Sequence, residues 1–334
     1  MGKQELLKDF ILNQIRTNKL KPGDRVYSRS KFMSKFDCAR ATVDKVLKDL
    51  ISAKILYGKK GAGTFVAPVK KAKPSKNIAL VSGELGAPSM PYRIAYSFME
   101  HMGPEYNIKF FTYNEIRHPA SWQRCKSQQG IIFILPDIQH SPFIIETRTQ
   151  DIPHIILYRN LPESSFVSID NQSAVINLVS ALAKKGCNNI AYLGIRESRY
   201  HFPQERYLGF LEGLLKNQFE LKKDLVHFIP EHSINLALNQ IFNSKIKPQG
   251  IILGSLQGIG QVITKIEKND FKIGKDVFLA CFDPVKENSY PFPVISLKSI
   301  AAEIGITGVQ VYKEQIKNPQ KLIQKYITPK IRKQ

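Results

Sequence analysis

The sequence predicts a small, mainly helical N-terminal domain followed by a larger α/β region built on parallel sheets. Two observations carry this prediction. Apolar residues recur at helical spacing within residues 11–66, whereas from residue 77 onward short apolar strands alternate with helices. Between the two, PVKKAKPSK is basic, bounded by proline and without apolar periodicity, as linkers are. We therefore expect a domain at 1–68, a linker at 69–76 and the α/β region at 77–334.

The N-terminal domain is predicted to hold three helices and a basic hairpin. In ILNQIRTNKLKPGDRV, Ile11, Leu12 and Ile15 share a face, and the Pro-Gly pair ends that helix. Ser28 is expected to cap a second helix, SRSKFMSKF. The third, CARATVDKVLKDLISAKIL, is expected to place five apolar residues on one face: Val43, Val46, Leu47, Leu50 and Ile51. YGKKGAGTFVA then predicts two strands around a glycine turn. This order is typical of a winged helix-turn-helix, which points to DNA binding.

The α/β region is predicted to form two doubly wound lobes. Buried strands are predicted in NIALVSGE, IKFFTY, GIIFILP, HIILYR, FVSIDN, NIAYLG, LVHFIP, GIILGS and VFLACFD. Helices are predicted at 93–102, 143–149, 174–185, 204–217, 233–243 and 257–269. Such a large number of strands favours two parallel sheets over one. We place the first lobe at about 77–186 and 296–320, and the second at about 187–295 and 321–334.

Composition supports a nucleic-acid partner. The net charge is +21, and residues 1–76 hold 19 Lys and Arg against 6 Asp and Glu, whereas residues 77–334 hold 30 against 22. The excess is therefore concentrated in the predicted DNA-binding part. The four cysteines are scattered without metal-type spacing, the N-terminal residues do not read as a signal peptide, and the longest apolar run is too short to span a bilayer. We expect a soluble cytoplasmic protein that does not engage membranes.

The N-terminal segment resembles the GntR family of bacterial repressors. The matching segments are Pro22-Gly23-Asp24, Val26-Tyr27-Ser28-Arg29, Ala39-Arg40-Ala41-Thr42-Val43 and Gly61-Ala62-Gly63-Thr64-Phe65-Val66. Three positions depart from the family pattern. Arg29 stands where the family usually has Glu, Ala39 replaces Ser, and Asp44 stands where an Arg often contacts DNA. A carboxylate near phosphates is repulsive, so Asp44 is expected either to read a cytosine amino group or to face away.

Residues 77–334 resemble the effector domain of the lac/galactose-repressor family, which has the periplasmic-binding-protein-like fold. The matching segments, in the family's order, are IPHIILYR, VSIDN, LAKKG, IAYLG, RYLGF, FLACFD and YITP. A GntR-type reader joined to such a domain resembles the arabinose-repressor type. The resemblance implies a ligand bound between the lobes at the carboxyl ends of the strands, and a dimer that changes on lobe closure.

Candidate DNA-contacting residues follow from the motif. Arg40, Thr42 and Lys45 are expected on the recognition helix, with Ser28 and Arg29 from the preceding helix. Arg40 is the best base-reading candidate, because Arg to guanine is the commonest specific contact. The basic turn is expected to neutralise phosphates or to enter the minor groove, and its glycines to allow close approach. Its residues are Lys59, Lys60, Gly61, Gly63 and Thr64.

Candidate ligand residues lie mainly at strand ends. Arg206, Asp170 and Asp283 match sugar-contacting positions of the lac-repressor family, where a guanidinium donates to vicinal hydroxyls and a carboxylate accepts from them. A structural helix-cap or lobe-bridging role is the alternative for Arg206, and an N-cap role for Asp170. A stacking surface for a sugar or another ring is a further hypothesis, with a core role as its alternative. The residues concerned are Tyr92, Arg93, Trp122, Tyr200 and His201.

Two departures bear on the ligand, and enzyme motifs are missing. Ser255-Leu256 and Ser299 stand where the family has residues that bind hydroxyls, which weakens the case for a simple aldose. The segment GSLQGIG lacks GxGxxG spacing, no Walker or GxSxG motif occurs, and no histidine pair has metal-ligand spacing. We therefore expect no enzymatic activity, no cofactor and no metal.

These observations together favour a transcriptional repressor that binds a palindromic double-stranded operator as a homodimer and is released by a small effector, with a sugar as the favoured class. A regulator that answers a non-sugar metabolite is the first alternative. A cytoplasmic solute-binding or sugar-modifying protein is the second.

Overall fold

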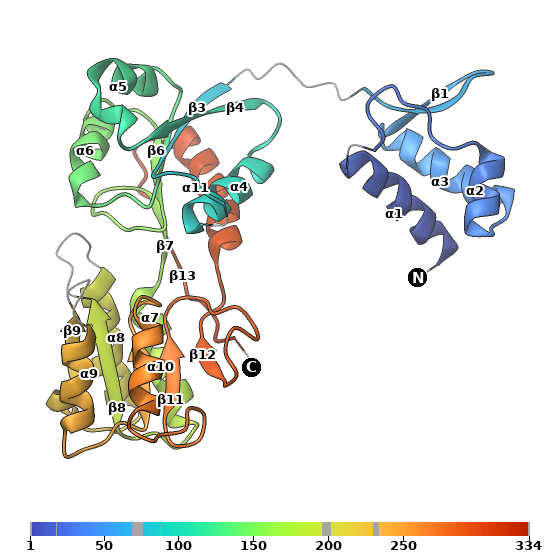
Figure 1. The fold of residues 1–334 in the computed structure, drawn as a ribbon. Coiled ribbons are helices and arrows are strands. Elements are labelled where there is room, and N and C mark those ends of the chain that lie inside the picture. The colour runs from blue at the N-terminus through green and yellow to red at the C-terminus, as the bar shows by residue number, and fades with distance from the viewer. Residues whose placement is uncertain are drawn as a thin grey trace. The chain divides into compact units, whose positions relative to one another are not determined.

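The chain divides into two compact units, Met1–Lys73 and Pro74–Gln334 (Figure 1). The computed structural model describes residues 2–17, 19–68, 76–87, 89–195, 202–229 and 234–332. Most of the predicted linker, 69–75, lies outside the described residues. Among the described residues, no helix is both long and apolar enough to cross a membrane.

The N-terminal unit holds three helices and an antiparallel hairpin in the order expected of a winged helix-turn-helix. The helices are α1 (Lys3–Arg16), α2 (Arg29–Phe36) and α3 (Arg40–Ser52), and the hairpin strands are β1 (Leu56–Lys59) and β2 (Gly63–Val66). The apolar face of α3 forms the core with Leu7 and Ile11 of α1 and Phe32 of α2. Ile51 was expected on that face but is 37% exposed, because it lies at the edge of the apolar stripe near the end of α3.

The first lobe of the C-terminal unit is a six-stranded parallel sheet in the order β13-β7-β6-β5-β3-β4. Its strands are β3 (Lys76–Ser82), β4 (Tyr106–Thr112), β5 (Ile131–Ile134), β6 (His154–Leu157), β7 (Phe166–Ile169) and β13 (Gln324–Ile327). Helices α4 (Met90–Met102) and α11 (Ala301–Lys317) cover one face; α5 (Pro119–Lys126) and α6 (Ser141–Thr149) cover the other. Side chains alternate along each strand, so a strand buried on both faces contributes to two cores.

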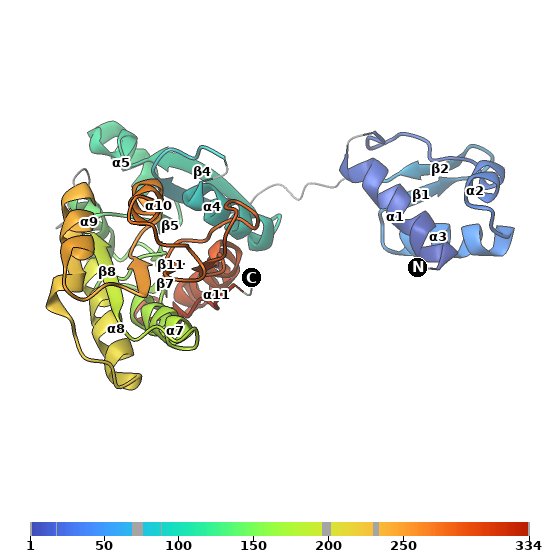
Figure 2. The same ribbon diagram turned by 60° about the horizontal axis from the view of Figure 1, so that its bottom comes forward.

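The second lobe is a five-stranded parallel sheet in the order β12-β11-β10-β8-β9. Its strands are β8 (Ile190–Ile195), β9 (Val226–Ile229), β10 (Gly250–Leu253), β11 (Phe278–Cys281) and β12 (Val294–Ser296). Helices α7 (Asn171–Ala183) and α8 (Phe202–Lys216) pack on one face, and α9 (Ile234–Asn243) and α10 (Ile259–Glu267) on the other (Figure 2). Short 3-10 helices cover Glu115–Arg117, Ile138–His140 and Lys223–Leu225.

Two boundaries between the lobes differ from the prediction. Helix α7 was placed in the first lobe, but its apolar face packs on α8 and on the strands of the second sheet. Residues 321–334 were placed in the second lobe, yet β13 pairs with β7 in the first sheet. The chain then returns to the second lobe, where Ile331 forms an antiparallel bridge with Leu297. Local sequence pattern does not report which of two similar sheets an edge strand or a covering helix joins.

Candidate functional site

The exposed face of α3 carries the predicted base-reading residues. Arg40, the first residue of the helix, and Lys45 are both exposed, while Thr42 is half-buried. Lys48 was not singled out from the sequence, yet it is exposed one turn after Lys45 on the same face. Helical spacing from Lys45 was the available signal. Three cationic side chains therefore line the outer surface of the helix that follows the turn of this helix-turn-helix.

Asp44 neither stands alone nor faces away from this surface. Its carboxylate pairs with Arg29 Nε of α2, and its other oxygen lies 3.7 Å from Arg40 Nε. All three side chains are exposed, so the ion pairs contribute little to stability, on the order of 0–1 kcal/mol. Their effect is to hold the two arginines of neighbouring helices against one acceptor. The carboxylate thereby orients Arg29 and Arg40 at the surface.

The hairpin presents a basic tip. Lys59, Lys60 and Gly61 are exposed, and Gly61 has a φ of 76°, which glycine adopts without steric cost. Thr64 was predicted to contact DNA, but it is 6% exposed because its side chain points to the core side of β2. Its carbonyl instead accepts a 3.0 Å hydrogen bond from Val26 N. The Thr64 side chain is therefore not presented at the surface of the hairpin, and any contact of this residue with DNA would be through its backbone.

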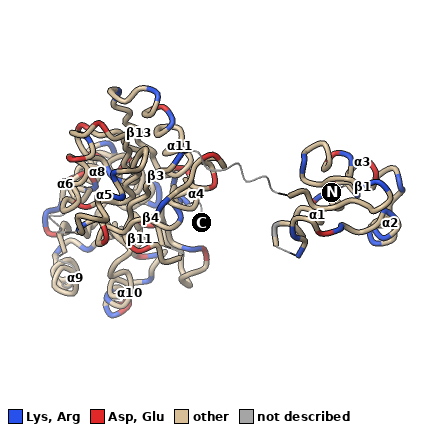
Figure 3. The backbone as a smooth tube through the Cα atoms, turned by 90° about the horizontal axis from the view of Figure 1, so that it is seen from above, with Lys and Arg blue, Asp and Glu red and all other residues tan. Residues whose placement is uncertain are grey.

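Arg25 and Gly63 fix the base of this hairpin. Arg25 pairs with Phe65 across an antiparallel bridge, and a Cβ on Gly63 would lie 2.7 Å from Arg25 Nε. Gly63 therefore leaves room for the guanidinium of Arg25, a cationic residue that the motif did not single out. Ser28 acts locally: its hydroxyl accepts from Lys31 N at 3.3 Å and caps α2. Figure 3 shows Lys and Arg along α2 and α3 of this unit.

In the C-terminal unit, the carboxyl ends of the first sheet's strands carry unusual backbone geometry. Leu135, directly after β5, has a φ of 48°, and Tyr158, directly after β6, has a φ of 69°. Neither is glycine, so both positions are strained by about 1–3 kcal/mol each. Tyr158 is nevertheless 7% exposed and held by its backbone N–H, which donates to Val167 O at 2.7 Å. Strain retained at adjacent strand ends is characteristic of binding sites.

Arg206 is a buried charged residue at the carboxyl ends of the strands of the second sheet. It is 5% exposed; its Nε donates to Asn171 Oδ1 at 3.0 Å and its Nη1 to the carbonyl of Gly254. The guanidinium lies 3.4 Å from the centre of the Phe282 ring. Burial lowers the pKa of Arg206, while Asp283 and Tyr158 oppose that shift. Arg206 thus joins α7, β10 and β11, and the two hydrogen bonds use two of its five N–H donors.

Both predicted carboxylates have protein partners. Asp170 caps α7, accepting from Ser173 N at 2.9 Å, and its second oxygen accepts from Thr328 Oγ1 at 3.1 Å. Asp170 therefore has the N-cap role that was the alternative to ligand contact. Asp283 Oδ2 accepts from Leu256 N at 2.7 Å and from Ser255 Oγ at 3.2 Å. Asp283 thereby shapes the turn that follows β10. The sequence alone did not indicate that Asp283 contacts this turn.

Glu205 links the two lobes and was missed by sequence reasoning. One of its oxygens accepts from Asn160 Nδ2, on the segment after β6, at 2.7 Å. The other accepts from Asn171 Nδ2, at the start of α7, also at 2.7 Å. Asn160 in addition donates to Tyr326 OH of β13 at 3.3 Å. A carboxylate directly before the predicted Arg206 was the only signal available. Glu205 and Arg206 thus share Asn171 between them.

A cavity of about 330 Å³ opens at the carboxyl ends of β8, β9 and β10. Its size is that of a small-molecule site. Its described lining combines apolar strand ends with neutral hydrogen-bonding side chains from the starts of α9 and α10, and it contains no charged residue. These are Leu193, Gly194, Ile195, Ile229, Ile234, Asn235, Leu253, Ser255, Gln257, Gly258 and Gln261. Asparagine, glutamine and serine both donate and accept, which suits hydroxyl groups.

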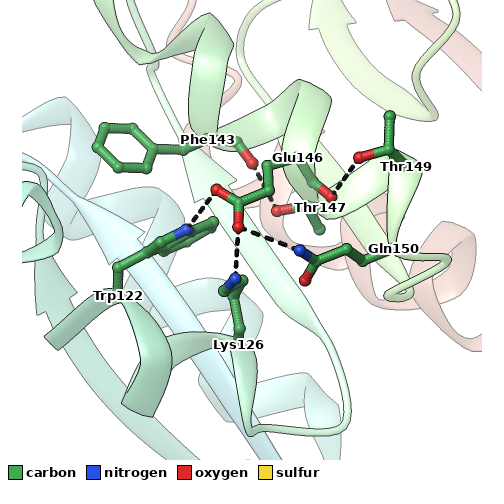
Figure 4. Close-up of polar contacts among 7 residues, drawn as sticks. All are labelled: Trp122, Lys126, Phe143, Glu146, Thr147, Thr149 and Gln150. Atoms are coloured by element: carbon green, nitrogen blue, oxygen red, sulfur yellow. Dashed lines mark hydrogen bonds and ion pairs between the residues drawn. The ribbon is translucent and has the colours of Figure 1, made fainter. Parts of the chain in front are cut away.

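The predicted stacking surface is not brought together in the described residues. Tyr92 and Arg93 lie in the first turn of α4, where Tyr92 stacks on Tyr96 at 6.2 Å. Tyr200 and His201 lie outside the described residues. Trp122 is a core residue: it is 6% exposed, and its Nε1 donates to Glu146 Oε2 at 2.7 Å, beside Lys126 and Gln150 (Figure 4). Its apolar ring and its satisfied N–H explain that placement.

Comparison with known proteins places the C-terminal unit in a known fold. Residues 179–333 match the family model for a periplasmic binding protein-like domain. A regulatory protein of the LacI family from Chloroflexus aggregans superimposes with a TM-score of 0.66 at 16% identity, over 76% of this chain and 96% of that one. The C-terminal unit therefore has the predicted two-lobed, periplasmic-binding-protein-like fold.

Two relatives are similar in sequence. The arabinose metabolism transcriptional repressor of Halalkalibacterium halodurans is 22% identical over 336 residues, which cover 90% of this chain and 84% of the relative. The histidine utilization repressor of Pseudomonas aeruginosa is 30% identical over 101 residues, which cover 30% of this chain and 40% of the relative. Both similarities are to transcriptional repressors by name.

Proposed function

We propose that this protein is a ligand-responsive transcriptional repressor. The observation that carries the proposal is the presence, in one chain, of a basic helix-turn-helix unit and a two-lobed unit whose second lobe holds a cavity of small-molecule size at the carboxyl ends of its strands. The two similar repressors, one of them named for arabinose metabolism, support the same reading. The N-terminal unit reads operator DNA, and the C-terminal unit senses the effector.

The reader is of the GntR type, with α3 in the major groove. Arg40, Lys45 and Lys48 are the exposed cations of that helix, and Lys59 and Lys60 form the tip of the hairpin. Arg40 reads a base edge, because a guanidinium binds guanine bidentately, whereas the hairpin lysines neutralise flanking phosphates. Asp44 positions Arg40 and Arg29 through its two ion pairs.

The repressor acts as a homodimer on a palindromic operator. Helix-turn-helix dimers read two half-sites that mirror the symmetry of the protein. Exposed apolar side chains on neighbouring elements of the first lobe support this lobe as the dimer face: Tyr96 of α4 is 52% exposed, Phe110 of β4 is 48% exposed and Ile306 of α11 is 36% exposed. A ligand that biases the two lobes then alters the spacing of the readers, by a coupling of about 1–3 kcal/mol.

A neutral, polyhydroxylated molecule is the effector class that the cavity supports best. Its described lining offers Asn235, Ser255, Gln257 and Gln261 as hydrogen-bonding partners and no charge to neutralise an ionic ligand. These residues supply the hydroxyl partners that Leu256 and Ser299 do not. A free sugar fits this chemistry, and binding releases the operator.

DNA binding is tested by selecting sequences from a random duplex library with the full chain. We expect a palindrome, bound with an affinity that falls steeply with salt. Arg40→Ala should remove discrimination between the selected and scrambled sequences, at a cost of about 1–3 kcal/mol, while salt-sensitive binding persists. Lys8→Ala on the exposed face of α1 is the matched control. Discrimination that survives Arg40→Ala would show that α3 is not the reading helix.

Effector binding is tested by calorimetry of the full chain against L-arabinose, other free pentoses and hexoses, and their phosphorylated forms. We expect a free sugar to bind and Gln257→Ala to weaken it, with Gln240→Ala on the exposed face of α9 as the control. Binding of phosphorylated sugars alone, or of no sugar at all, would contradict the neutral effector class.

A further inference from the structure

A second cavity in the C-terminal unit has the opposite character. Its volume is about 570 Å³, within the range of small-molecule sites, and it lies beside β12, between α7 and the C-terminal segment. Lys184 and Lys185, directly after α7, and Phe278, the first residue of β11, place it toward the amino ends of the strands. The effector cavity described above lies at the carboxyl ends. The two are therefore separate sites.

Four cationic side chains converge on this basic pocket. Lys184 and Lys185 come from the end of α7, and Lys330 and Arg332 from the segment that runs antiparallel to β12. Among the described residues that line it, none carries a carboxylate. Within the described parts of the chain, none of the four forms an ion pair with an acidic residue, although eight pairs of a Lys or Arg with a carboxylate occur elsewhere. Four unpaired cations around one concavity repel one another unless an anion joins them.

The floor of the basic pocket is apolar and partly aromatic. Phe278 and Ile295 are both only half-buried, and Lys185 Nζ lies 5.9 Å from the centre of the Phe278 ring. A cavity lined by cations and by a half-buried aromatic ring matches a ligand with phosphates at one end and a flat body at the other. We propose that this pocket binds a phosphorylated metabolite with a planar body, of the nucleoside diphosphate class.

Such a ligand would act on a connection between the lobes. Lys330 and Arg332 follow β13 of the first sheet by only a few residues, and Ile331 between them is bridged to Leu297 of the second lobe. The backbone N–H of Lys298 donates to Lys330 O at 2.8 Å, and that of Arg332 to Ser296 O at 2.8 Å. Phosphates bound between residues 330–332 and α7 would therefore hold the segment that connects the two lobes against the second lobe. Because the proposal concerns binding at the pocket, it stands independently of the proposed function.

The test is calorimetric titration of the full chain with ADP, with adenosine as the uncharged probe. We expect one ADP per chain and an affinity for adenosine at least about tenfold weaker, because phosphate contacts supply the charge-assisted hydrogen bonds. The double variant Lys184→Ala/Lys185→Ala should weaken ADP binding by at least about tenfold. Lys223→Ala/Lys268→Ala, which removes two exposed lysines outside the pocket, should leave it unchanged.

A second variant separates the pocket from general attraction to a basic protein. Ala181→Phe fills the cavity from the half-buried side of α7 without changing any charge, and it should also abolish ADP binding. If its thermal unfolding midpoint shows that it is misfolded, Lys330→Ala/Arg332→Ala takes its place. No ADP binding, binding that survives the pocket variants, or adenosine binding as tight as ADP binding would overturn the proposal.

Discussion

Glu205 is expected to couple the two lobes through its paired hydrogen bonds. Its two oxygens accept from Asn160 and Asn171, each at 2.7 Å. In Glu205→Gln only one acceptor oxygen remains and it carries no charge, so at most one asparagine retains an acceptor there. A hydrogen bond to a charged group contributes about 1.5–3 kcal/mol. We therefore expect the free energy of unfolding to fall by about that amount.

The assay is urea denaturation, arranged as a double-mutant cycle. Asn160→Ala and Glu205→Gln should each destabilise, and the double variant should cost less than the sum, because each change already breaks the same bond. Glu212→Gln is the control on the same helix, since Glu212 binds Gln172 and Lys216 within the second lobe. Costs for Asn160→Ala and Glu205→Gln that add to within about 0.3–0.5 kcal/mol would refute the coupling.

Three further predictions concern the reader, the packing and pH. Asp44→Ala should leave salt-sensitive DNA binding intact but reduce discrimination between sequences, measured by anisotropy on the selected palindrome; unchanged discrimination would remove its positioning role. Gly209→Ala should lower the free energy of unfolding in urea by about 1–3 kcal/mol, because the new Cβ would lie 2.3 Å from Gln172 O. Gly260→Ala, in open space on α10, should be neutral or stabilising. Equal effects of the two substitutions would contradict this packing. Burial lowers the pKa of His154, so below about pH 6.5 the unfolded chain binds a proton that the folded chain does not, and the free energy of unfolding should fall as the pH drops. In His154→Gln the dependence of this free energy on pH, measured by urea denaturation, should be weaker. An unchanged pH dependence would show that other groups cause it.

Helix α3 and the hairpin were predictable because their signals are local. Apolar spacing fixed the core face of α3, and a glycine turn fixed the hairpin tip. The burial of the Thr64 side chain was not predictable, because the alternation of a four-residue strand sets which side chains face inward, and a motif match does not report that phase. For Asp44 the sequence left open whether it reads a base or faces away. It could not show the ion pair with Arg29, because Arg29 lies on another helix.

The C-terminal unit was predictable as a fold, but its candidate site was not. Short apolar strands alternating with helices indicated two parallel sheets. The contacts that build the lobe junction are distant in sequence: Glu205 meets Asn160 across 45 residues, and Thr328 meets Asp170 across 158. No periodicity records such pairings. The composition of the described lining of the 330 Å³ cavity likewise depends on which strand ends become neighbours in the sheet.

The most direct test of the central claim is the affinity of the full chain for its selected palindrome, measured by anisotropy with and without saturating free sugar. The account predicts tight binding to the palindrome in the absence of sugar and a loss of about 5–150-fold when the sugar that binds calorimetrically is added. An affinity that does not distinguish the palindrome from scrambled DNA, or that no bound sugar alters, would contradict it.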